Sequence, residues 1–179
     1  MERKPIEPGK IVMREFRLVK GQIDSPYEFK VSNIQKFDYD VAYSPAINLN
    51  ESLIKADFAI NISSQSEGNQ VEATGSYHFT FVFFYEHLKD HAVLLPGAGF
   101  DWNPTLANAI ASITYSTSRG ILLSRFQGTA MSSFILPVVD PNALMQPATG
   151  TTKRTAHLAA PEKNVAEQSF PTSSSQNPQ

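Results

Sequence analysis

The sequence contains no cysteine. This absence excludes disulfide bonds, a cysteine nucleophile and thiolate metal ligands, and it is compatible with a reducing compartment such as the cytosol. A strong charge of either sign is also missing, because 15 basic and 17 acidic residues leave a net charge of −2. We therefore expect no binding of nucleic acid through neutralisation of its phosphates.

No long apolar run marks the chain for secretion or for insertion into a membrane. Residues 1–10, MERKPIEPGK, are charged and contain proline, and no apolar run of the signal-peptide kind follows them. Residues 103–128 are too rich in Asn, Ser and Thr for a membrane span, which needs roughly 20 predominantly apolar residues. We expect a cytoplasmic protein without membrane insertion.

Local signatures of catalysis and of cofactor binding are missing as well. Ser, His and Asp all occur, yet the sequence has neither a nucleophile elbow nor a glycine-rich phosphate loop. His87 and His91 are four residues apart, a spacing that binds metal on a helix. Pro96 and the apolar strand before them indicate a loop instead, and no third ligand can be named. We expect no acyl-transfer enzyme, no cofactor and no metal.

Alternation of apolar and polar residues, the period of a β-strand, dominates the first half of the chain. The first such segment places Val12, Phe16 and Leu18 on one side. Residues 79–85, FTFVFFY, are apolar at nearly every position, as expected where a strand is covered on both faces. Residues 67–69 predict a turn before that strand. We predict extended segments at 11–20, 23–31, 37–44, 54–62 and 70–85.

Residues 103–128 predict one long helix with almost no charge. Asn103 can cap its first turn, and Pro104 occupies a position where its missing N–H does no harm. One stripe of the helix is apolar, while other positions are small. Because a helix in water normally carries charge on its exposed side, we expect the sheet to cover one face and a second copy of the chain to cover the other. The predicted oligomer interface comprises Ala109, Ser112, Ser116 and Gly120.

Strands followed by a long helix predict an α+β fold with an antiparallel sheet, because no strand follows a helix. The connection at 86–100 can pack as a flap. Asp140 can cap a short second helix that begins at Pro141. From residue 146 the composition shifts to Thr, Ser, Pro, Gln and Ala, which is typical of disorder. We predict a flexible leader at 1–10, one domain at 11–145 and a disordered tail at 146–179.

Several of these residues together resemble the SecB-type export chaperones. The resemblance covers roughly residues 12–145, and the order of elements agrees along it. Residues 72–79, EATGSYHF, resemble the fourth strand of that family, which begins with an acidic residue and contains a glycine. The residues that carry the resemblance in the helical half are Asn103, Ser118-Arg119-Gly120, Leu136-Pro137-Val138 and Ala143-Leu144.

The resemblance implies a four-stranded antiparallel sheet packed on the long helix, with a short helix after it. It also implies a homotetramer, a dimer of dimers joined through the long helices. Its implied function is that of an ATP-independent holdase, which binds unfolded or precursor polypeptides in an apolar groove and can pass them to the SecA motor for export. The family's Lys-Asp after the first strand is Lys20-Gly21 here, which leaves Glu72 and Asp24 as candidate motor contacts.

Two other functions stay open. SecB-like proteins include chaperones dedicated to one partner, such as an antitoxin or a mobile-element protein. This chain could be one of them, because its tail carries Lys153, Arg154 and Lys163 and does not resemble an acidic motor-binding tail. A small-molecule enzyme would need a concave pocket with convergent polar groups.

The groove of a holdase should have an apolar and adaptable wall, because an unfolded client presents apolar segments and backbone. Aromatic, leucine and methionine side chains meet that requirement. Each of them could instead be an ordinary core residue. The candidate groove residues are Phe29, Phe37, Tyr39, Leu94, Leu95, Leu144 and Met145.

Overall fold

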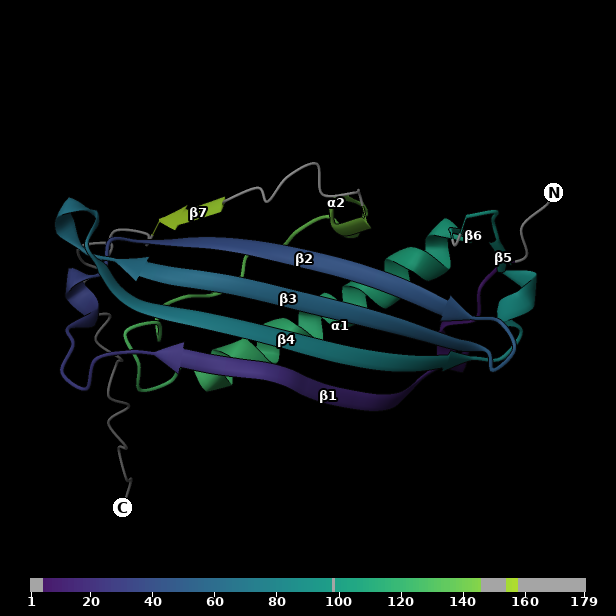
Figure 1. Ribbon diagram of the computed structural model, residues 1–179, viewed down its shortest axis with the longest axis horizontal. Helices are drawn as coiled ribbons and strands as arrows, with labels where there is room; N and C mark the ends of the chain where they lie inside the picture. The colour runs from purple at the N-terminus through teal and green to yellow at the C-terminus, as the bar shows by residue number, and fades with distance from the viewer. Residues whose placement is uncertain (1–4, 98, 146–153, 158–179) are drawn as a thin grey trace, which may run out of the picture.

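An antiparallel β-sheet packs on one long α-helix (Figure 1). The computed structural model describes residues 5–97, 99–145 and 154–157. The main sheet has the strand order β1-β4-β3-β2-β7, and all its neighbouring strands are antiparallel. The predicted α+β class is therefore confirmed. The strands are β1 (Ile11–Asp24), β2 (Lys36–Asn48), β3 (Leu53–Gln65), β4 (Val71–Tyr85) and β7 (Arg154–His157).

The predicted number of strands is wrong, because the main sheet has five strands and not four. The fifth, β7, lies within the tail that the sequence predicts as disordered, and it pairs with β2. Its 4 residues are too few for a recognisable alternation. The rest of that tail, 146–153 and 158–179, lies outside the described residues. The extended segment predicted at 23–31 is a strand only as far as Asp24.

Strand β1 has an irregular register near its start. Val12 lies opposite Phe84, which is half-buried on the outer face of the sheet, whereas Phe16 lies opposite Phe81, which is buried under the helix. An extra residue in one strand moves the side chains that follow it to the other face. The prediction that Val12 shares a side with Phe16 and Leu18 is therefore wrong for Val12.

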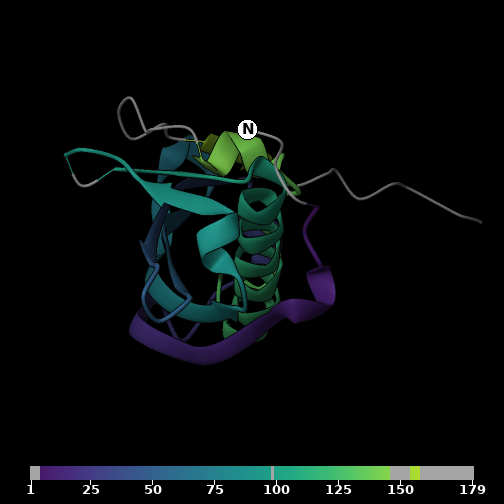
Figure 2. The same ribbon diagram turned by 90° about the vertical axis from the view of Figure 1, so that its right-hand side faces the viewer.

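Helix α1 (Pro104–Arg125) crosses the inner face of the sheet (Figures 1 and 2). Its predicted start is confirmed, because the Thr105 N–H donates to Asn103 Oδ1 at 2.9 Å. The helix ends at Arg125, earlier than predicted, and the chain turns away through Gly128, whose φ of 73° favours glycine. No helix in the described ranges has the length and apolar character needed to cross a membrane.

The core between α1 and the sheet is built largely from phenylalanine. Phe58 of β3 is fully buried and meets the Tyr115 ring of α1 edge-on, with centroids 5.6 Å apart. Edge-to-face contacts of this kind add to the stability gained from burial. The side chains of β4 that face α1 are also fully buried at Phe79, Phe81 and Phe83.

The outer face of β4 is only partly covered. Val82 and Phe84 point away from α1 and are half-buried. The Arg14 guanidinium lies over the Phe84 ring, 5.0 Å from its centroid. The expectation that both faces of residues 79–85 are covered is therefore met only in part. Among the described residues no second layer of structure covers the outer side, where the Arg14 cation lies over one ring.

The connections between strands and helices contain short elements. The predicted flap folds as a hairpin of β5 (Ala92–Leu94) and β6 (Phe100–Trp102). The predicted short helix is α2 (Pro141–Met145), and the Asn142 N–H donates to Asp140 Oδ1 at 2.9 Å, as expected of a cap. Turns of 3-10 helix occur at Pro8–Lys10, Val31–Asn33, Glu67–Asn69 and Leu88–Asp90.

Candidate functional site

A groove lies where the segment after α1 folds back along that helix. It has a volume of about 240 Å³. One wall comes from α1 and the other from residues 138–144, which run into α2. We call it the α1–α2 groove. Its lining residues are Ser112, Tyr115, Ser116, Arg119, Val138, Val139, Pro141 and Leu144.

The wall opposite α1 is apolar. Val138 is 80% exposed, Val139 is half-buried and Leu144 is buried beneath them. An apolar side chain that enters the groove from a bound molecule would contact the exposed valine and the buried leucine at the same time. The groove therefore suits an apolar side chain of a bound molecule.

The α1 wall supplies polar groups. The Tyr115 hydroxyl donates to the Pro137 carbonyl at 2.7 Å, which holds the segment after the helix against α1. Within the described part of the chain, the buried Arg119 Nε and Ser118 Oγ have no hydrogen-bond partner. An unmatched buried donor is costly, and Arg119, whose side chain lines the groove, would reduce that cost by reaching an acceptor such as a backbone carbonyl.

Burial raises the pKa of Tyr115 from its ordinary value of 10.0 to about 12, with a smaller contribution from nearby Tyr39, while Arg154 and Arg119 act in the opposite direction. In the unfolded chain this phenol ionises first as the pH rises. The stability that it contributes is thus complete below pH 10 and falls between pH 10 and about 12.

We expect Tyr115→Phe to make unfolding less sensitive to pH between 10 and about 12. At neutral pH it should cost about 1 kcal/mol, through the lost hydrogen bond. The free energy of unfolding in urea, measured at several pH values, checks both. Tyr27→Phe is the control, because Tyr27 is 99% exposed. Equal pH profiles for Tyr115→Phe and the unmodified protein would contradict the expectation.

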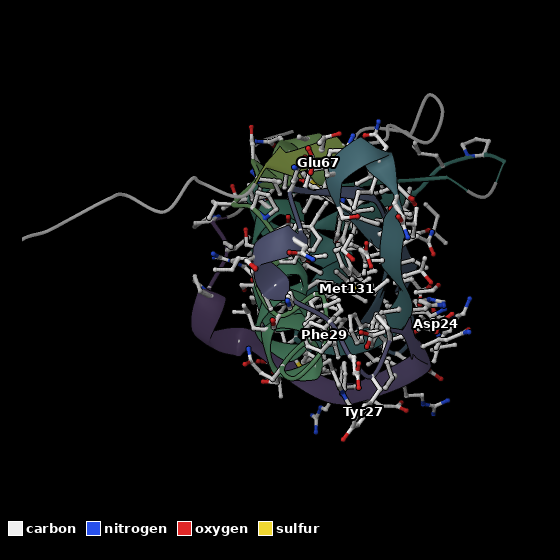
Figure 3. The ribbon with its side chains drawn as sticks, turned by 90° about the vertical axis from the view of Figure 1, so that its left-hand side faces the viewer. Asp24, Tyr27, Phe29, Glu67 and Met131 are labelled. Atoms are coloured by element: carbon white, nitrogen blue, oxygen red, sulfur yellow. The ribbon has the colours of Figure 1, made fainter. Side chains whose placement is uncertain are left out.

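The predicted groove residues do not gather in one place. Phe37 and Tyr39 are buried in the core, 2% and 5% exposed, with their rings against Phe134. Phe29 is half-buried in the connection between β1 and β2 (Figure 3). Met145 is half-buried and outside the groove lining, so only Leu144 of the predicted set lines the α1–α2 groove.

The two flap leucines are on the surface. Leu94 is 63% and Leu95 47% exposed, and the Leu95 N–H donates to the Gly99 carbonyl at 2.9 Å. Backbone pairing thus holds the tip of the hairpin with both leucines outside the core. They form a separate apolar surface that the α1–α2 groove lining does not include.

The predicted oligomer face is open. Ser112, Ser116 and Gly120 are exposed and Ala109 is half-buried. The Ser116 hydroxyl donates to the Ser112 carbonyl at 2.6 Å, so it presents little unmet polarity. A Cβ added to Gly120 would meet nothing within 4 Å. The face is flat and partly shared with the groove, because Ser112 and Ser116 line both.

Another apolar surface lies on β1, and the sequence analysis did not predict it as exposed. Met13, Phe16 and Leu18 point toward the α1 side of the sheet, yet they are 40%, 42% and 39% exposed. Phe16 contacts the Phe81 ring with centroids 5.1 Å apart. These inward side chains of the edge strand therefore stay partly open to solvent. Alternation alone predicts them as core.

The candidate motor contacts lie at one end of the sheet. Asp24 ends β1 and is exposed (Figure 3), opposite Thr74 of β4. Glu72 is two positions before Thr74, at an irregularity in the register between β3 and β4, is half-buried and accepts a hydrogen bond from the Ser66 hydroxyl at 2.5 Å. The structure therefore brings the two acids to the same end of the sheet.

A polar hollow of about 340 Å³ lies across β2, β3 and β4. Its acid Asp40 accepts from Asn61 Nδ2 at 3.0 Å, and Asn61 Oδ1 accepts from the Ser76 hydroxyl at 2.8 Å. The polar groups are paired with one another across the strands, as in a sheet surface.

His87 and His91 do not form a metal site with other side chains. In the described ranges no group of three or more His, Cys, Asp or Glu side chains could hold an ion. His91 is buried against the Tyr85 ring, with centroids 5.3 Å apart. His87 is exposed at the start of the 3-10 turn. The turn separates the two histidines into different surroundings.

No protein-family model matches the sequence, and no curated protein matches it. Among solved structures, the chain is similar to a SecB-like chaperone of Mycobacterium tuberculosis in complex with a ChAD peptide from the HigA1 antitoxin. The two chains are 18% identical, and the match covers 73% of this chain and 91% of that chain with a TM-score of 0.49.

Proposed function

We propose that this protein is an ATP-independent holdase that binds unfolded polypeptides in the α1–α2 groove. The observation that carries the proposal is the 80% exposure of Val138 in a groove that buried Leu144 and the Arg119 side chain also line. An unfolded chain offers apolar side chains to Val138 and Leu144, and it offers backbone carbonyls to Arg119. The proposal includes a cytoplasmic location and no catalytic step.

The size of the groove limits what one copy can hold. About 240 Å³ receives one or two side chains and not a long segment. Further apolar contacts would come from the flap leucines and from the β1 surface. Several weak contacts at separate surfaces favour promiscuous binding, because no single pocket selects the client.

The direct test is aggregation of a chemically denatured client diluted into buffer without nucleotide. The purified protein should slow the rise in light scattering in proportion to its concentration. Bovine serum albumin at equal mass is the control for crowding by an added protein. Scattering that rises as fast as in the control would refute the holdase proposal.

We also propose a homotetramer assembled through the small-residue face of α1. A flat face of serine and glycine lets two helices approach closely, and a polar, uncharged surface loses little by being covered. Ser116→Phe should overpack such an interface and reduce the mass from tetramer to dimer or monomer. Light scattering after gel filtration measures it, with Ser44→Phe as control, an exposed serine of β2 outside the helix.

An unchanged mass for Ser116→Phe, with unmodified protein that is tetrameric, would show that another surface forms the assembly. A monomeric unmodified protein would refute the tetramer itself. Neither result bears on the holdase assay of the unmodified protein, because that assay measures aggregation of the client.

Co-purification distinguishes an export chaperone from one dedicated to a single partner. The position of Asp24 and Glu72 at the same end of the sheet favours an export motor, since two neighbouring acids can bind a basic surface. Recovery of a motor protein, lost in Asp24→Asn with Glu72→Gln, would support export. Recovery of one stoichiometric antitoxin or mobile-element protein, independent of both acids, would support the alternative.

A further inference from the structure

Strand β7 covers only one end of β2 (Figure 1). Arg154 lies opposite Tyr39, and the pairing continues antiparallel to His157 opposite Lys36. Beyond Tyr39, residues 40–48 of β2 pair only with β3 among the described residues. Within the described part of the chain, the longer part of this edge thus has no strand partner, and such an edge is a template for another strand.

The contacts of β7 show what the edge accepts. The Thr155 hydroxyl donates to Asp38 Oδ1 at 2.8 Å on the outer face. Ala156 lies opposite Phe37 on the inner face and packs against the core. A strand on this edge therefore places a hydrogen-bond donor over an acid and an apolar side chain over the core.

The same pattern continues past β7. Asp40 follows Asp38 on the outer face, while Val41 and Tyr43 follow Tyr39 on the inner face and are half-buried. A strand added along the edge would need donors or positive charges outside and apolar side chains inside. Opposite charges across neighbouring strands stabilise such a pair, and like charges destabilise it.

The edge also borders the α1–α2 groove. Arg154 of β7 lies close enough to Tyr115 for its charge to oppose the rise in the pKa of that groove residue. Helix α2, which carries Leu144 of the groove, packs against β2. A polypeptide that lies in the α1–α2 groove could therefore continue along the edge of β2 with which β7 pairs.

We propose that the outer edge of β2, residues 36–48, binds an extended polypeptide by antiparallel strand addition, and that β7 is an internal strand which competes for the first part of this edge, residues 36–39. The bound segment alternates apolar residues with threonine, lysine or arginine. This inference rests on the proposed function and adds the binding mode, the sequence preference and an inhibitory role of the tail. Main-chain hydrogen bonds give affinity in strand addition, and alternate side chains give preference.

The test compares full-length proteins that differ only in β7. In Thr155→Pro with Ala156→Pro, one of the two adjacent prolines must remove a donor to β2, because successive residues of an antiparallel strand point their amides to opposite sides. Ser173→Pro with Ser174→Pro is the matched control in the same tail. Thr155→Val is a milder variant that removes only the hydroxyl bonded to Asp38.

The probe is a fluorescein-labelled synthetic peptide in which valine alternates with threonine or lysine, followed by fluorescence anisotropy. If β7 occupies the edge about nine-tenths of the time, the double proline variant should bind the peptide about tenfold more tightly than the unmodified protein. Thr155→Val should shift affinity in the same direction by less. A peptide with glutamate in place of threonine and lysine should bind weakly to all variants.

Equal affinity of the double proline variant and the serine control would overturn the competition by β7. Failure of the valine peptide to bind any variant would overturn the edge site, and equal binding of the glutamate peptide would overturn the stated preference. The aggregation assay on the same proteins separates the two proposals. Slowed aggregation without peptide binding refutes only the edge, whereas peptide binding without slowed aggregation refutes only the holdase.

Discussion

Phe58→Ala should lower the free energy of unfolding by about 3–5 kcal/mol, the usual cost of removing a buried aromatic ring. Phe58 is fully buried on β3, a central strand, and its ring meets Tyr115 of α1. Neither the sheet nor the helix can close the cavity easily, since β3 is hydrogen-bonded on both sides. Urea unfolding followed by circular dichroism measures the change.

Tyr27→Ala is the matched control for Phe58→Ala. Tyr27 is also aromatic, but it is 99% exposed and points away from the protein (Figure 3). Its loss should change the free energy of unfolding by less than about 0.5 kcal/mol. A cost below about 1.5 kcal/mol for Phe58→Ala would mean that α1 and the sheet move together and close the cavity more readily than the packing indicates.

Val138→Asn should weaken the hold on apolar clients about tenfold or more, because full burial of a valine is worth about 1.5–3 kcal/mol. Val138 is 80% exposed in the free protein, so the fold should not suffer. Asparagine is uncharged, so it does not form an ion pair with Arg119 as an acidic residue would. Titration of a labelled unfolded client measures the dissociation constant, and thermal unfolding checks the fold.

Val71→Asn is the control for the groove. Val71 is 52% exposed at the start of β4 and is outside the α1–α2 groove lining. The Val71→Asn substitution should leave client binding unchanged. If Val71→Asn and Val138→Asn weaken binding equally, total surface hydrophobicity and not this groove determines it. If neither weakens binding, the groove has no part in holding clients.

Elements with local signals were predictable to within a few residues. Asn103 and Pro104 mark the start of α1, and Asp140 marks the start of α2, because caps depend on neighbours in the chain. The long strands followed from alternation. Strands β5, β6 and β7, which have 3 or 4 residues each, carry too little pattern.

The candidate site was much less predictable, because it depends on which segments meet. Alternation marks Phe37 and Tyr39 as one face of a strand, but it does not say that Phe134 covers that face. In the sequence, Val138 was noted only as part of the family resemblance, and Tyr115 was not part of that resemblance. They line a groove because the chain folds back after α1, and a hydrogen bond from Tyr115 to Pro137 fixes that return.

The register of β1 also sets the order in which the protein can assemble during its synthesis. Ile11 pairs with Tyr85, and β1 has no other strand partner in the described sheet. The ribosome must therefore complete β4 before β1 can dock, a wait on the order of 4–15 s at about 5–20 residues per second. During that time the apolar side of β1 is exposed in the nascent chain, which makes this first strand the segment most in need of protection before folding ends.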